Sequence, residues 1–236
     1  AGGTVTVNGT IAANGGMGVG HFGGGSGGSI LLDCGTFAGS TNGLISANGG
    51  DVWPGYGYWG NGAGAGGRIS VCYTGLAAGT AVRFATAPGT NEWALDQTYG
   101  DADACWNLAA EWGTLYLTNA ALFSTNLQDR LFHMTRLVIP GFASWGPDSL
   151  TVSNCSFQIG ESGFALTVTN SLRIDGGGVL KVGAPDDAGA EVCVGQDLTL
   201  TNGSALHVFS GPPNGASPDY GGLVAVPNHL SIGPGS

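Results

Sequence analysis

The sequence predicts an all-β protein built as a parallel β-helix, a β-solenoid with glycine-rich turns and an irregular central insertion. Three observations lead to this fold class. A fixed spacing of aliphatic residues occurs twice between residues 166 and 208 and begins a third time near the end of the chain. Helical periodicity is absent from these copies. The 46 glycines of the 236 residues fall between short strand-like pairs, as expected for turns between many strands.

The repeat follows the spacing two, four, two, six, two. The copies hold Leu166, Val168, Leu172, Ile174, Leu180 and Val182, then Val192, Val194, Leu198, Leu200, Leu206 and Val208, then Val224, Val226, Leu230 and Ile232. Two residues separated by one position lie on the same face of a strand. Because stacked repeats share one core, we expect Leu172, Leu198 and Leu230 to be neighbours in the interior.

The first part of the chain, residues 1–75, is predicted to form glycine-rich coils of the same kind. The phrase Ala13-Asn14-Gly15-Gly16 returns 34 residues later as Ala47-Asn48-Gly49-Gly50. The glycine-rich stretches 21–28 and 51–67 are bounded on both sides by repeat phrases. Ordered corners, where glycine tolerates unusual dihedrals, are therefore favoured over flexible linkers.

Residues 76–148 are predicted to be less regular coils with a lateral insertion, within which 122–134 is compatible with a short helix or a further coil. Residues 149–236 are predicted to be regular, open-ended coils, so that the three parts form one continuous solenoid.

The formal net charge is −10, with six Lys and Arg residues in total. This balance argues against nucleic acid and anionic membrane surfaces, since both attract basic patches. Membrane insertion is not expected either, because no stretch approaches the roughly 20 apolar residues of a membrane-spanning helix.

The five cysteines are widely spaced and form no C-x-x-C motif, which disfavours zinc ribbons and thioredoxin-type chemistry. The alternation of the strands predicts that Cys34 faces inward and Cys193 outward. A disulfide between Cys34 and Cys72 is left open, although the two lie out of phase relative to their glycine pairs.

The most unusual candidate surface is an aromatic loop that contains Trp53, Tyr56, Tyr58 and Trp59. Four aromatic residues within seven positions could stack on sugar rings or contact another subunit. The simpler reading is a loop that covers part of the solenoid core.

Two acidic pairs, Asp101 with Asp103 and Asp186 with Asp187, are the candidates for a hard cation such as calcium. Neither belongs to a complete calcium motif, and exposed acidic pairs are commonly just solvated. No cofactor and no catalytic residues are expected, because no hydrolase, zinc-protease or P-loop motif occurs. Six basic residues also equip the chain poorly to neutralise uronate groups as a polysaccharide lyase would.

The two extremities supply the remaining candidates, which are Val5 and Val7 at one and Leu230 and Ile232 at the other. No polar cap follows Leu230, so we expect an open core that associates end to end into a filament or continues in a longer chain. The favoured function is a non-enzymatic structural or adhesive element. The alternative is a module that binds or degrades polysaccharide.

The phrases G-T-V-T-V-N-G-T-I-A-A-N-G-G and G-A-G-A-G-G-R-I-S-V resemble glycine-rich repeats of very large secreted bacterial surface proteins, and the C-terminal copies resemble the pectin-lyase-like β-helix group. The resemblance implies a right-handed parallel β-helix outside the cell or on the bacterial surface. This fold hosts adhesins, passenger domains, lyases and tailspikes alike, so it assigns no activity. No catalytic motif of the group matches this sequence.

Overall fold

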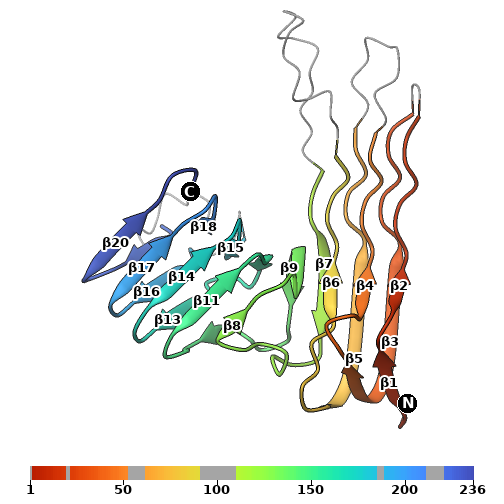
Figure 1. Cartoon of the computed structure of the whole chain (residues 1–236), viewed down its shortest axis with the longest axis horizontal. Helices are drawn as coiled ribbons and strands as arrows, with labels where there is room; N and C mark the ends of the chain where they lie inside the picture. The colour runs from red at the N-terminus through yellow and green to blue at the C-terminus, as the bar shows by residue number, and fades with distance from the viewer. Residues whose placement is uncertain (1, 20–21, 53–61, 91–109, 185–188, 211–220) are drawn as a thin grey trace, which may run out of the picture. The chain divides into compact units, whose positions relative to one another are not determined.

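The computed structural model describes residues 2–19, 22–52, 62–90, 110–184, 189–210 and 221–236. Within these ranges the regular elements are the strands β1 to β20, and none is a helix (Figure 1). The all-β prediction is therefore confirmed, and no described segment is a helix long and apolar enough to cross a membrane. The chain divides into two compact units: unit 1 holds Ala1–Tyr116 and His133–Thr135, and unit 2 holds Leu117–Phe132 and Arg136–Ser236.

Unit 1 is built from two rows of parallel strands. The first row is β1 (Thr4–Val7), β3 (Ser29–Gly39) and β5 (Arg68–Leu76), and the second is β2 (Thr10–Ala12), β4 (Leu44–Ser46) and β6 (Arg83–Ala85). Strand β7 (Gly113–Leu117) comes later in the chain. Ile11 pairs with Ile45, and Ile30 pairs with Ile69. The repeated phrases of residues 1–75 are therefore neighbouring strands.

The two rows face each other across an apolar core. Phe37 of the first row and Ile45 and Phe84 of the second are fully buried. The Phe37 ring centroid lies 6.0 Å from that of Tyr73 and 6.3 Å from that of Phe84. Burial of side chains of this size contributes about 1.5–3 kcal/mol each, so this core positions the strands of unit 1.

The glycine-rich stretches continue the strands as extended segments. Segments 13–18, 47–52 and 86–90 follow the strands of the second row, whereas 22–28 and 62–67 lead into β3 and β5. In Figure 1 they form the long parallel traces beyond the labelled arrows. The described parts of these stretches are therefore not the tight corners expected from composition.

Hydrogen bonds hold these segments together with a three-residue period. Along the second row, the N–H groups of Gly15 and Gly18 donate to the carbonyls of Asn48 and Asp51. Between rows, Gly28 N and Gly25 N donate to Ala13 O and Gly16 O, at 2.6 and 2.8 Å. A period of three is that of polyproline II, which satisfies its backbone groups through neighbours rather than internally.

Glycine is required here for space rather than for its dihedral freedom. A Cβ on Gly49 would lie 1.9 Å from Gly64 O, and one on Gly64 would lie 2.0 Å from Gly25 O. The φ angles of these glycines lie outside the left-handed region. The apolar core of the strands thus gives way to a bundle in which backbone contacts backbone.

Unit 2 is built from three parallel sheets, which the chain visits in turn. The strands are β8 (Asn126–Leu127), β11 (Leu150–Ser153), β14 (Leu172–Asp175), β17 (Asp197–Leu200) and β20 (His229–Ile232) in one sheet; β10 (Ser144–Trp145), β13 (Ala165–Val168), β16 (Glu191–Val194) and β19 (Leu223–Ala225) in another; and β12 (Ser156–Ile159), β15 (Val179–Val182) and β18 (Ala205–Val208) in the third. Strand β9 (Phe132–Val138) has residues in both units. One passage through the three sheets is called a coil below. These features are consistent with a β-solenoid.

The aliphatic repeat forms continuous inward columns. Leu172, Leu198 and Leu230 are direct partners on β14, β17 and β20. The same holds for Leu166 and Val192, which are both fully buried. The predicted alignment of the repeats is therefore confirmed.

Aromatic packing replaces the aliphatic columns at the start of unit 2. The Phe123 ring lies 5.2–6.1 Å from those of Phe132, Phe142, Trp145 and Phe157. Residues 122–134 contain β8 and the start of β9, so the alternative of a short helix there is wrong. Bulky rings fill a region where the strands are too short and irregular to supply paired aliphatics.

Candidate functional site

The last described coil of unit 2 exposes residues that the preceding coil buries. Leu198 is 2% exposed, whereas its partner Leu230 is 58% exposed. Leu200 and Ile232 form a second such pair, at 8% and 58%. The sequence pattern selects Leu230 and Ile232 for the core, yet nothing among the described residues covers them.

The backbone of this coil is also available for pairing. Among the described strands, β20 pairs only with β17, and β19 pairs only with β16. An edge strand with unpaired N–H and C=O groups is a template for another strand. The last coil therefore combines an open apolar core with unpaired strand edges.

The other predicted edge, in unit 1, is less exposed. Val7 is 4% exposed, whereas Val5 is half-buried. Strand β1 pairs only with β3, and β2 only with β4, among the described strands. Backbone edges are thus open at this end as well, although its apolar side chains are better covered than Leu230 and Ile232.

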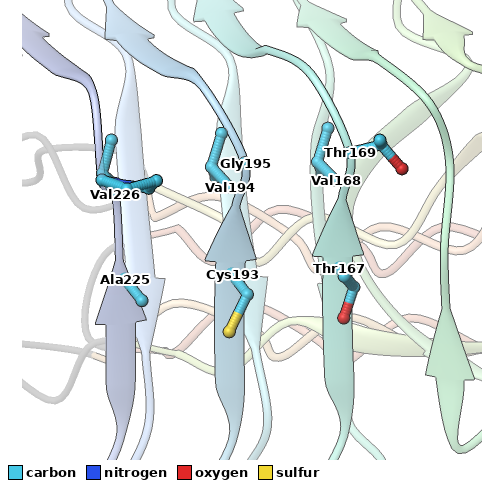
Figure 2. A pocket seen from close by; sticks show the side chains of 9 residues that line it. Thr167, Val168, Thr169, Cys193, Val194, Gly195, Ala225 and Val226 are labelled. Carbon is cyan, nitrogen blue, oxygen red and sulfur yellow. The ribbon is translucent and has the colours of Figure 1, made fainter.

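A shallow groove of about 670 Å³ runs along the outside of β13, β16 and β19 (Figure 2). Thr167, Cys193 and Ala225 form one column along it, with register partners on adjacent strands. The turn residues Thr169, Gly195 and Pro227 form part of the lining. No acid, base or aromatic side chain lines it, so the groove offers shape and one thiol but no catalytic group.

The charged residues of unit 2 form small local pairs. Arg173 Nη2 contacts Asp175 Oδ2 at 2.8 Å, and Arg173 Nε donates to the same oxygen at 2.9 Å. The Ser153 hydroxyl and the Arg173 guanidinium lower the pKa of Asp175. This arrangement stabilises a turn of the solenoid and presents no acid–base pair to a substrate.

Lys181 and His207 lie side by side on the outside of β15 and β18. Partial burial lowers the pKa of both, and the charge of Lys181 lowers that of His207 further. His207 is exposed, as its predicted outward position requires.

The cysteines of the described ranges are all free. Cys34 is buried and Cys193 is partly exposed, as predicted from strand parity. Cys34 pairs in register with Tyr73 rather than Cys72, so the two thiols face opposite sides and the disulfide left open does not form. Burial raises the pKa of Cys155, which makes its thiol a poor nucleophile.

Several predicted site residues lie outside the described residues. These are the aromatic loop Trp53, Tyr56, Tyr58 and Trp59, and the acidic pairs Asp101 with Asp103 and Asp186 with Asp187. The described part of the chain contains no group of three His, Cys, Asp or Glu side chains that could hold a metal ion.

Sequence reasoning missed two features. One is the groove, because outward Thr, Cys and Ala residues carry no pattern of their own. The other is the set of glycines on the edge of unit 1, Gly3, Gly9 and Gly16, which face open space among the described residues. A signal for the second was present, since the Ala-Asn-Gly-Gly phrase repeats its glycines on an edge as well as inside the bundle.

Comparison with known proteins gives no relative: no family model, no curated protein and no solved structure matches this chain.

Proposed function

We propose that this chain is a structural β-solenoid whose three sheets close into a right-handed helix, and that a further coil packs on its exposed last coil. The further coil belongs to a second copy or to the rest of a larger surface protein. The chain then acts outside the bacterial cell as scaffold or adhesive material. The resemblance of its glycine-rich repeats to those of secreted surface proteins supports that location.

The observation that carries the proposal is the contrast between successive coils in the same column. Leu230 and Ile232 keep the spacing and residue type of the buried Leu198 and Leu200, but more than half of each is exposed. Covering two such side chains contributes about 1.5–3 kcal/mol each. A coil of the same register covers them and pairs the free edges of β19 and β20.

The remaining chemistry of the described residues fits a structural role. The groove lacks acids and bases, and the Arg173–Asp175 pair lies within a single strand. Backbone hydrogen bonding and inward aliphatics account for most conserved-looking features of the repeat, without any cluster suited to catalysis in the described ranges.

The test is sedimentation velocity of the purified chain over a range of concentrations, with electron microscopy of the same samples. The double variant Leu230→Lys with Ile232→Lys should reduce association, because it places two charges in the open core. Ser231→Lys is the matched control, since Ser231 lies between them and faces outward. A wild-type chain that stays monomeric throughout contradicts self-association, and equal assembly by the double variant contradicts the assigned surface.

A further inference from the structure

The edge of unit 1 carries glycines at places where glycine has no function within the chain. We call residues 2–18 the edge segment, because β1 and β2 are each paired on one side only among the described strands. A Cβ on Gly3, Gly9 or Gly16 would meet no described atom within 4 Å. None of the three has φ in the left-handed region. In an extended segment, glycine costs about 0.5–1 kcal/mol relative to alanine.

The equivalent glycines one strand further in do have a reason. A Cβ on Gly43 would lie 2.2 Å from Val7 O, and one on Gly50 would lie 2.0 Å from Gly16 O. A Cβ on Gly35 would lie 2.9 Å from Gly2 O. Each interior glycine therefore admits the backbone of the segment before it. Gly3, Gly9 and Gly16 offer the same close approach to a segment that is absent from the described structure.

Apolar burial on this edge is incomplete in the same direction. Val5 and Ile11 are half-buried, whereas their register partners Phe37 and Ile45 are fully buried. Met17, at the end of the edge segment, is 54% exposed. A neighbouring segment would cover these side chains as well as contact the glycines.

The edge segment also lacks the usual protection against pairing. Exposed edges are commonly guarded by charged side chains or proline. Residues 2–18 contain no Asp, Glu, Lys, Arg or Pro, in a chain whose net charge is −10. Two copies of this edge can therefore approach each other without the repulsion that the rest of the acidic chain would cause.

We infer that two copies of this chain associate through their edge segments, backbone against backbone, in a two-fold arrangement. A two-fold axis places the two segments antiparallel. The glycine bundle already accepts antiparallel neighbours, because Gly25 N and Gly28 N of the returning segment donate to Gly16 O and Ala13 O. The edge is thus complementary to itself. The proposal concerns unit 1 and does not depend on the exposed last coil of unit 2.

The test uses the full chain carrying Leu230→Lys and Ile232→Lys, so that association through the last coil cannot contribute. Sedimentation equilibrium should give the mass of a dimer in this background. Adding Gly9→Val and Gly16→Val should give a monomer with an unchanged circular dichroism spectrum, because both new side chains point into open space in the single chain. Gly62→Val is the matched control: its Cβ is equally open in unit 1, but it lies away from the edge segment, and the dimer should persist.

A monomeric background chain overturns the inference, and so does a dimer that survives both valines. If the valine variant does not fold, hydrogen exchange of the background chain decides. Amides of residues 4–18 should exchange more slowly at high than at low concentration, whereas exchange that is independent of concentration contradicts the proposed edge. None of these outcomes bears on the last coil, whose own test uses wild-type unit 1.

Discussion

Leu198 and Leu230 are direct partners on neighbouring strands, yet one is buried and the other is more than half exposed. The two residues thus share one column and one pattern but differ in whether a further coil lies above them. The contrast makes them a sensitive pair for measuring how the stacked coils stabilise each other.

Leu198→Ala should lower the free energy of unfolding by about 2–5 kcal/mol, because it leaves a cavity in a packed column. Leu230→Ala should change it by about 0.5 kcal/mol or less when measured at a dilution where the chain is monomeric. Urea unfolding followed by circular dichroism gives both values. Equal effects of the two substitutions would contradict the assigned burial.

Gly64→Ala should destabilise unit 1 by more than about 1 kcal/mol, because its Cβ would lie 2.0 Å from Gly25 O. Gly62→Ala, two residues away, meets nothing described within 4 Å and should be neutral or stabilise by about 0.4–1 kcal/mol. Thermal unfolding compares them. If both alanines are tolerated, the glycine segments do not pack backbone to backbone.

The fold of unit 2 could be predicted because its residues report on their neighbours. The spacing of Leu172, Leu198 and Leu230 encodes both strand period and repeat length, and each inward aliphatic needs the same environment. The register of the strands follows directly from that repetition.

The glycine bundle of unit 1 could not be predicted in the same way. Gly15, Gly49 and Gly64 have no side chain, so nothing in the sequence records which backbone they contact or in which direction. The same residues suit a linker, a corner or a packed extended segment equally well. The aromatic cluster around Phe123 was missed for a different reason, since large rings fill irregular space without any fixed spacing.

The edge candidates could be predicted only in part. The repeat identified Leu230 and Ile232, because an unfinished copy leaves its inward residues uncovered. It treated Val5 and Val7 alike, although the opposing row buries Val7 and leaves Val5 half-buried. Such differences arise from contacts between rows, which a period along one strand does not contain.

Acid should remove the contribution of Asp175 to stability. The Ser153 hydroxyl and the Arg173 guanidinium hold the pKa of this carboxyl below its ordinary value of 3.8. A lowered carboxyl pKa stabilises the fold above the unfolded value and is lost as pH falls through the folded value. The difference in unfolding free energy between wild type and Asp175→Asn should therefore shrink as pH falls below about 4. A constant difference from neutral pH downwards would contradict the assignment.

His207 should titrate below its ordinary pKa of 6.5, because of partial burial and then the charge of Lys181. Lys181→Met should raise that pKa towards 6.5 without reaching it, since burial remains. The folded state binds the proton less well than the unfolded state, so this group lowers stability as pH falls through about 6.5. NMR titration of the imidazole carbons measures both pKa values, and an unchanged value in Lys181→Met would contradict the contact.

The central claim is that the aliphatic repeats stack in register as successive coils. Methyl-to-methyl nuclear Overhauser spectroscopy on leucine-labelled protein tests it most directly, because neighbouring strands lie about 4.8 Å apart and alternate strands about twice as far. We predict cross-peaks from Leu198 to both Leu172 and Leu230, with none or a much weaker one between Leu172 and Leu230. Absence of both Leu198 cross-peaks would contradict the stacked coils and the function proposed from them.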